Sequence, residues 1–295
     1  MTLMRLEKLM PLVSLILCLA APMQTVAETA KIIRYPRVSA TADPHVDYVI
    51  ELLTLAIKHS GQTFQLVPNA DPMQQARAIY EMSSKSGTID VIWTMTTDER
   101  ETQLLPIRIP IDKGLIGWRI SLLSANNAEL FREVTSLQDL SRFSAGQELD
   151  WPDVSILRNN GLAVQISTSY EPLFTMLKGG RFNYFPRSVF EINNELNSHP
   201  KLNLTIDKYL VLHYPSALYF FVTPREPKVA EAIQVGLEEI TKNGAFEKTF
   251  QKHLSATIRA ANIKQRTIIE LQNPLLKTDK APFNRPELWY HPDTK

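Results

Sequence analysis

The feature that most constrains the fold is a repeated alternation of short apolar runs with amphipathic segments. Residues 31–36 (KIIRYP), 63–68 (TFQLVP) and 89–95 (IDVIWTM) are short and apolar, which is typical of strands. Between them, residues 46–61 and 71–87 carry apolar side chains at helical spacing, and each segment closes on a glycine. The second of these helices is expected to hold its proline in the first turn. This order predicts an α/β fold in which helices cover a mostly parallel sheet.

The alternation restarts further along the chain, and this repeat predicts two lobes. A long extended run, 114–123 (GLIGWRISLL), precedes new strand and helix patterns between residues 142 and 199, and a second long run, 214–223 (YPSALYFFVT), follows them. Two similar units joined by two extended runs indicate a double-strand hinge and a cleft at the carboxyl ends of the strands. The predicted parts are a signal peptide (1–27), lobe 1 (28–118 and 217–261), lobe 2 (119–216) and a proline-rich, aperiodic C-terminal tail laid on the surface (262–295).

The N-terminus has the pattern of a cleaved secretory signal peptide. Arg5 and Lys8 precede an apolar stretch at 9–21, and the small residues Thr25 and Ala27 stand at the two positions that signal peptidase reads. The stretch is shorter than the roughly 20 apolar residues that cross a membrane. The alternative is a buried N-terminal helix. The only cysteine lies in this segment, so a processed chain has no disulfide and fits the bacterial periplasm.

The composition excludes several functions. With 44% hydrophobic and 21% charged residues and a formal net charge of +1, the chain is ordinary globular protein without a nucleic-acid-binding patch. The six histidines show no metal-ligand spacing, and neither a nucleophile motif nor a phosphate loop is found. We expect a protein that is not an enzyme and uses no cofactor or metal, and we also expect a monomer.

The stretch TMTTDERET, which follows the apolar run at 89–95, is the first candidate site. Thr94, Thr96 and Thr97 bring hydroxyl groups to the end of a strand, where backbone N–H groups are also free to bind an anion. Arg100 lies one helical turn further on, within reach of the same place, and its fork could grip a carboxylate. The alternative is structural: Thr97 caps a short helix that begins near Asp98, and Arg100 is a surface side chain.

Four segments together resemble the periplasmic solute-binding proteins of the polar amino-acid ABC transporter family (family 3). They are GTIDVIWTMTTDERE, TSLQDL, MLKGGRFNYF and EEITKNGAFEKTFQKH, in the family's order over roughly residues 31–255. The resemblance implies a type II periplasmic binding fold. It also implies that Arg100 binds the ligand's carboxylate, helped by Thr94 and Thr96. The loops expected at the same cleft add Tyr35, Gln147 and Trp151 as candidate ligand-binding residues.

Two departures from the family pattern bear on the ligand. Arg187 stands where the family places an acid that holds the α-amino group, and a guanidinium cannot bind an ammonium. Either Arg187 points away from the cleft or the ligand carries a second anionic group there. The family's glycine-rich turn is also replaced by GQELDWPD, which brings Glu148, Asp150 and Asp153. These acids could be a hydrolase's carboxylates, or one could cap the next helix while the others meet solvent.

Three functions follow from these patterns. The first is a periplasmic protein that closes on a small carboxylate-bearing solute, anionic or zwitterionic, and presents it to an ABC-type permease. The second is a sensory partner of the same fold that acts on a membrane receptor. The third is a secreted hydrolase, for which the sequence offers no nucleophile.

Overall fold

The computed structural model describes residues 30–37, 44–277 and 279–292. The predicted signal peptide lies outside these residues. Everything from Lys31 onward forms one unit, and within its described part no helix is both long and apolar enough to cross a membrane.

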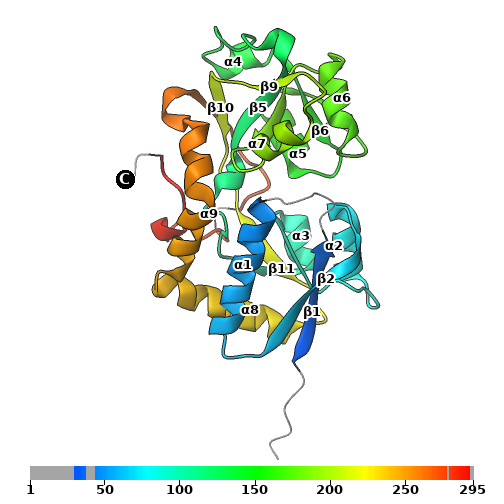
Figure 1. Cartoon of the computed structure of the whole chain (residues 1–295), viewed down its shortest axis with the longest axis vertical. Coiled ribbons are helices and arrows are strands. Elements are labelled where there is room, and N and C mark those ends of the chain that lie inside the picture. Colours follow the sequence, from blue (N-terminus) through cyan, green and yellow to red (C-terminus); the bar gives the residue numbers. More distant parts are fainter. Residues whose placement is uncertain (1–29, 38–43, 278, 293–295) are drawn as a thin grey trace, which may run out of the picture. The chain divides into compact units, whose positions relative to one another are not determined.

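A first set of elements is built from both halves of the chain. It comprises β1 (Lys31–Arg37), α1 (Pro44–His59), β2 (Phe64–Pro72), α2 (Gln75–Ser83), β3 (Val91–Met95), α3 (Asp98–Gln103), β4 (Leu105–Ile107), β11 (Leu218–Val222), α8 (Pro227–Lys242) and α9 (Ala245–Ala261). β1 pairs with β2, and β11 lies between β3 and β4. In Figure 1 the yellow α8 lies beside the blue α1, although the two helices are far apart in sequence. Gly236 permits this contact, because a Cβ there would lie 1.7 Å from the carbonyl oxygen of Ala56.

A second set of elements holds the middle of the chain. It comprises η1 (Leu115–Gly117), β5 (Trp118–Ser124), η2 (Ala125–Asn127), α4 (Leu137–Leu140), β6 (Ser144–Glu148), α5 (Pro152–Asn159), β7 (Ala163–Ser167), α6 (Pro172–Lys178), β8 (Phe185–Ser188), α7 (Ile192–Ser198), β9 (Leu204–Ile206) and β10 (Leu210–His213). β6 pairs with β7, while β5 pairs with β8, β9 and β10. Most of these elements are drawn in green in the upper part of Figure 1.

The α/β class is confirmed, but the sheets are mixed rather than mostly parallel. The pairs β1–β2 and β6–β7 are parallel and enclose a helix in sequence, as expected. β11 runs antiparallel to β3 and β4, and β5 runs antiparallel to its partners. β5 lies in the first long extended run and β11 in the second, so the antiparallel pairs are made by the two runs that join the sets of elements. The limits of the two lobes stay a prediction.

Two expectations about local structure were wrong. Pro72 ends β2, where it pairs with Arg37, and α2 begins only at Gln75. The C-terminal segment is not an aperiodic surface tail throughout, since β12 (Thr267–Glu270) adds a parallel strand to β10. The short helices η3 (Ile263–Gln265) and η4 (Pro286–Leu288) flank this strand in sequence. Leu288 is fully buried, so part of the predicted tail belongs to the core.

Candidate ligand-binding site

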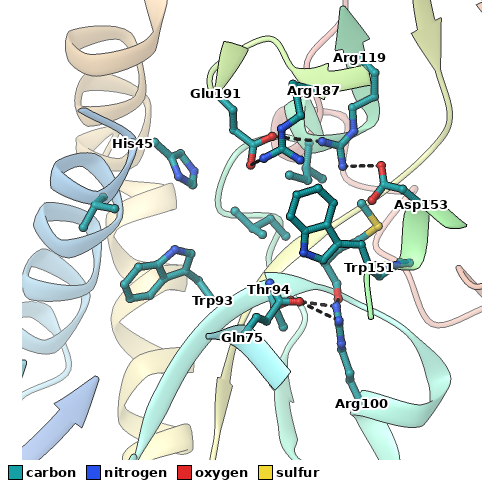
Figure 2. Close-up of a pocket in the computed structure, with 15 residues that line it drawn as sticks. His45, Gln75, Trp93, Thr94, Arg100, Arg119, Trp151, Asp153, Arg187 and Glu191 are labelled. Atoms are coloured by element: carbon teal, nitrogen blue, oxygen red, sulfur yellow. Dashed lines mark hydrogen bonds and ion pairs between the residues drawn. The ribbon is translucent and has the colours of Figure 1, made fainter. Parts of the chain in front are cut away.

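Two adjoining cavities form a cleft between side chains of the first and second sets. The first has a volume of about 220 Å³ and the second about 470 Å³. The residues that line both are His45, Gln75, Trp93, Trp151, Arg187 and Glu191. Figure 2 shows the first cavity, with the rings of Trp93 and Trp151 and three arginines on its walls. The cleft is therefore aromatic and strongly charged at the same time.

The wall from the first set is built at the carboxyl end of β3. Thr94 and Met95 are the last residues of this strand, and both line the first cavity. The chain then turns into α3, whose first turn carries Arg100 back toward the strand end. Gln75, the first residue of α2, completes this wall. Ligand sites in open α/β sheets occur at such strand ends, as the sequence indicated.

Arg100 is buried, at 8% exposure, and all of its hydrogen-bond acceptors are neutral. Its Nη1 donates to Thr94 Oγ1 at 2.9 Å and to the carbonyl oxygen of Met95 at 2.7 Å. Its Nη2 donates to Gln75 Oε1 at 2.8 Å and lies 3.5 Å from the carbonyl oxygen of Asp150. Within the described residues no carboxylate lies in ion-pair range of the guanidinium. Burial lowers the pKa of Arg100 to about 10, although nearby carboxylates such as that of Asp153 act in the opposite sense.

The threonines of the TMTT turn have separate roles. Thr94 is the one that lines the cleft and contacts the guanidinium of Arg100. Thr97 caps α3, because its hydroxyl accepts the backbone N–H of Arg100 at 3.2 Å. Thr96 donates its hydroxyl to Glu101 at 2.8 Å and lines neither cavity of the cleft. The predicted helix cap is thus present, but the surface position that this alternative gave to Arg100 is wrong.

Arg187 lies on the wall from the second set and lines both cavities, so it does not point away from the cleft. Its Nη2 lies 2.7 Å from Glu195 Oε1 and 3.2 Å from Glu191 Oε1. The guanidinium also stacks on the ring of Trp151, 4.4 Å from its centroid. Burial alone would lower the pKa of Arg187, but these carboxylates outweigh it and raise the pKa well above the usual value. The charge of Arg187 is therefore already neutralised inside the protein.

A second ion-paired arginine, which the sequence reasoning missed, lies beside Arg187. Arg119 Nη2 is 2.9 Å from Asp153 Oδ1, and Nη1 is 3.2 Å from Glu191 Oε2. Tyr214 accepts a hydrogen bond from Arg119 Nε at 2.8 Å and donates its hydroxyl to Asp153. A charged residue within the apolar run GLIGWRISLL was the available signal. Of the acids in GQELDWPD, Asp153 therefore supports an arginine instead of facing a substrate as a free catalytic group.

The remaining candidates divide between the cleft and the core. Trp151 lines both cavities, as expected. Tyr35 packs near Trp93, with ring centroids 6.3 Å apart, and lines neither cavity. Gln147 is fully buried in β6, where its Nε2 lies 3.5 Å from the carbonyl oxygen of Pro186, and it also lines neither cavity. Side chains alternate along a strand, so Glu148, the next residue of β6, faces the cleft instead of Gln147.

Several solved structures share this fold. AbpA, an amino-acid ABC transporter substrate-binding protein of Streptococcus pneumoniae bound to L-arginine, is 16% identical, with 78% of this chain and 95% of that chain covered and a TM-score of 0.54. The Salmonella typhimurium periplasmic binding protein STM4351, described as highly specific for arginine, is 15% identical over 76% and 99% of the two chains, with a TM-score of 0.53. The chain has a periplasmic-binding-protein fold.

A third similar structure comes from a different class of protein. It is a histidine kinase sensor domain described as similar to periplasmic binding proteins, 15% identical over 77% of this chain and 95% of that chain, with a TM-score of 0.53. No protein-family model and no curated protein sequence matches the chain. At such low identities the structural likeness concerns the fold alone.

Proposed function

We propose that this chain is a periplasmic solute-binding protein whose cleft closes on a small carboxylate-bearing solute, with Arg100 holding the carboxylate. The observation that carries the proposal is a buried guanidinium in a cavity, surrounded by neutral acceptors only. The protein then presents the solute to an ABC-type permease. A cleaved signal peptide would deliver it to the periplasm, and the extended runs through β5 and β11 would act as the hinge.

The electrostatics of Arg100 favour an anionic ligand group. A buried charge without an ionic partner is costly, and the lowered pKa of Arg100 reflects that cost. A carboxylate would remove it. Nε of Arg100 has no acceptor among the described residues, and Nη2 can exchange its long 3.5 Å contact with Asp150 for a carboxylate oxygen, which gives the ligand two charge-assisted hydrogen bonds. Thr94 and Gln75 already hold the guanidinium in place, so the ligand meets a preorganised partner.

A contact between the two sets of elements suggests how binding and closure are linked. Asp150 belongs to the loop after β6, yet its carbonyl oxygen lies 3.5 Å from Nη2 of Arg100. A carboxylate bound to Arg100 would therefore lie next to the loop that leads to Trp151. Such contacts stabilise a closed arrangement of the two lobes, which is how a ligand shifts a conformational equilibrium.

A sensory role is the second candidate, favoured by the kinase sensor domain of similar fold. In that case the closed protein would dock on a membrane receptor instead of a permease. The genes next to this one separate the two roles. Permease and ATPase genes indicate transport, whereas a kinase or cyclase gene indicates sensing.

The experiment that tests the proposal is a ligand titration of Arg100→Ala. Amino acids, dicarboxylates and other small anions are first screened by thermal shift, since a ligand at about 100 times its Kd stabilises a protein by roughly 2.7 kcal/mol. Removing one partner of a buried charged pair costs roughly 2–5 kcal/mol. We therefore expect Arg100→Ala to weaken the strongest ligand on the order of 30-fold to several-thousand-fold in isothermal titration.

Circular dichroism of the same variant provides the folding control. A folded Arg100→Ala protein that binds within about threefold of the wild type, roughly 0.65 kcal/mol, would contradict the proposal. Arg77→Ala is a matched control, because this exposed arginine of α2 pairs with Glu81 outside the cleft. Its affinity should equal that of the wild type.

A further inference from the structure

We propose that Glu148 binds the cationic end of a two-ended solute whose carboxylate lies on Arg100. The inference rests on the proposed function and names the class of solute: carboxylates that carry an ammonium or guanidinium group at the far end of a chain. In such solutes an α-amino group is not required.

Glu148 is the one acid of the cleft whose carboxylate meets no partner within the described residues. It is the last residue of β6, is 8% exposed and lines the second cavity. Its neighbours in that cavity are engaged, since Glu191 and Glu195 both bind Arg187. Glu171, the remaining acid there, has a side chain that is 74% exposed and contacts His199. A mostly buried side chain whose carboxylate opens onto a cavity, with no donor among the described residues, is ready to accept a cation.

Without a cation in the cavity, the surroundings of Glu148 destabilise the ionised form of its carboxyl group. Burial and the nearby Asp150 raise the pKa of Glu148, and Arg187 compensates only in part. A bound ammonium or guanidinium would supply the missing charge and hydrogen-bond donors. Trp93, Trp151 and Tyr170 line the same cavity, and aromatic faces also attract cations.

The same argument explains why Arg187 is compatible with a cationic solute. The ion pairs of Arg187 with Glu191 and Glu195 leave it little attraction for a second ligand anion. The cation then binds at Glu148, in the adjoining cavity, instead of at position 187. The solute would extend across both cavities, with its carboxylate on Arg100 and its cationic group on Glu148. A dicarboxylate would bring its second charge against the unpaired Glu148, which is unfavourable.

Three probes of nearly equal length separate the two ends of the proposed solute. They are γ-aminobutyrate with a distal ammonium, butyrate without a distal charge, and glutarate with a distal carboxylate; L-lysine and L-arginine extend the series to longer cationic chains. Isothermal titration compares wild type, Glu148→Gln, Arg100→Ala and the control Glu231→Gln, which removes an exposed charge on α8 outside the cleft.

We expect the wild type to prefer the cationic probes over butyrate and glutarate. Glu148→Gln keeps the shape of the side chain and should weaken the cationic probes on the order of 10- to 100-fold, because it removes a charge-assisted contact. Binding of butyrate and glutarate should stay equal or improve, and Glu231→Gln should behave as wild type. The unfolding midpoint of each variant confirms that it is folded.

Each failure has its own signature. If probes bind in an Arg100-dependent manner but Glu148→Gln leaves the preference for a cation unchanged, the role of Glu148 is wrong while the proposed function stands. The same holds if glutarate binds best. If Arg100→Ala binds the carboxylate probes as the wild type does, the proposed function is wrong. If no cationic probe of the series binds the wild type, the proposed role of Glu148 is wrong, and the wider screen of small anions with Arg100→Ala decides on the proposed function separately.

Discussion

Arg100 and Arg187 are two buried arginines on the walls of one cleft, and they differ in what surrounds their charge. Arg100 donates to a hydroxyl, a carbonyl and a side-chain amide. Arg187 donates to two carboxylates and stacks on Trp151. The pKa of Arg100 is lowered by burial, whereas the acids around Arg187 outweigh its burial and raise its pKa. Two arginines that are buried to a similar extent therefore differ in whether the protein supplies a counter-charge.

We propose that this difference separates a ligand-binding residue, Arg100, from a structural one, Arg187. The charge of a buried cation with carboxylate partners is already neutralised, so an added anion would bind there only weakly. A buried cation with neutral partners lacks its counter-charge, and a ligand can supply it. Both arginines carry their charge at neutral pH, so the proposed distinction rests on whether the protein itself supplies the counter-charge. Three experiments of decreasing expected effect test this distinction.

Loss of Arg187 should destabilise the fold strongly, whereas loss of Arg100 should not. Arg187→Met leaves the buried Glu195 without its ionic partner, whereas Glu191 keeps its ion pair with Arg119, and breaking a buried pair costs about 3–5 kcal/mol. Arg100→Met loses hydrogen bonds to neutral acceptors but also removes the desolvation cost of an unpaired charge, and these effects oppose each other, so the free energy of unfolding should fall by less than in Arg187→Met. Urea denaturation of both variants measures this difference. Equal destabilisation by the two substitutions would remove the basis of the comparison.

Asp112 extends the comparison to an acid that has no ionic partner within the part of the chain that the structure describes. It is fully buried and accepts the backbone N–H groups of Gly114 and Ile116, at 3.0 and 2.6 Å. Burial nevertheless raises the pKa of its carboxyl to about 7 from 3.8. The native state then binds the proton more tightly than the unfolded state does. The free energy of unfolding should therefore fall as the pH rises from about 4 to about 7, by roughly 2–4 kcal/mol in total.

The variant Asp112→Asn isolates this contribution. Asparagine cannot ionise, so the variant should lack the part of the pH slope that Asp112 causes, up to about 1.4 kcal/mol per pH unit. Denaturant unfolding of wild type and variant at a series of pH values between these limits gives the two slopes. Parallel curves would show that Asp112 carries its charge in the folded protein without penalty.

Arg100→Lys has the smallest expected effect. It tests whether the positive charge or the planar pair of N–H donors of the guanidinium binds the ligand. Lysine keeps the positive charge but cannot form two parallel hydrogen bonds with a carboxylate. We expect a loss of about 1–2 kcal/mol, or roughly 5- to 30-fold in Kd, for the ligand found by screening. Isothermal titration beside Arg100→Ala measures it. A lysine variant as weak as the alanine variant would assign the whole effect to geometry, and one as strong as wild type would assign it to charge.

Much of the fold could be predicted because its signals are local. The helical spacing around Leu53 predicted α1, and the apolar run before Thr94 predicted β3. The place of Pro72 was predicted wrongly. A proline can open a helix or end an edge strand, and only the pairing with Arg37 decides between these two positions. The strand around Ile269 was missed for a similar reason. Its short, mostly exposed segment pairs with β10, and only that distant partner defines it as a strand.

The site was predictable on one wall and not on the other. Thr94 and Arg100 are six residues apart, and a strand followed by one turn of helix brings them together. Local geometry therefore sufficed to place them in one candidate site. Arg187 was also named, but its partners Glu191 and Glu195 give it a role that no motif indicated. Arg119 meets Asp153 and Glu191 only because β5, α5 and the chain after β8 converge.

The sequence by itself determined the α/β class, the order of most elements and the position of Arg100 in the short helix that follows β3. Apolar periodicity and the strand-to-helix turn act over a few residues, so they can be read along the chain. The tertiary structure alone decided which charged residues of the cleft form ion pairs. It paired Arg187 and Arg119 with acids, and among the described residues it left Arg100 and Glu148 without ionic partners. Coulomb energies and desolvation depend on distances in space, which the order of residues along the chain does not contain.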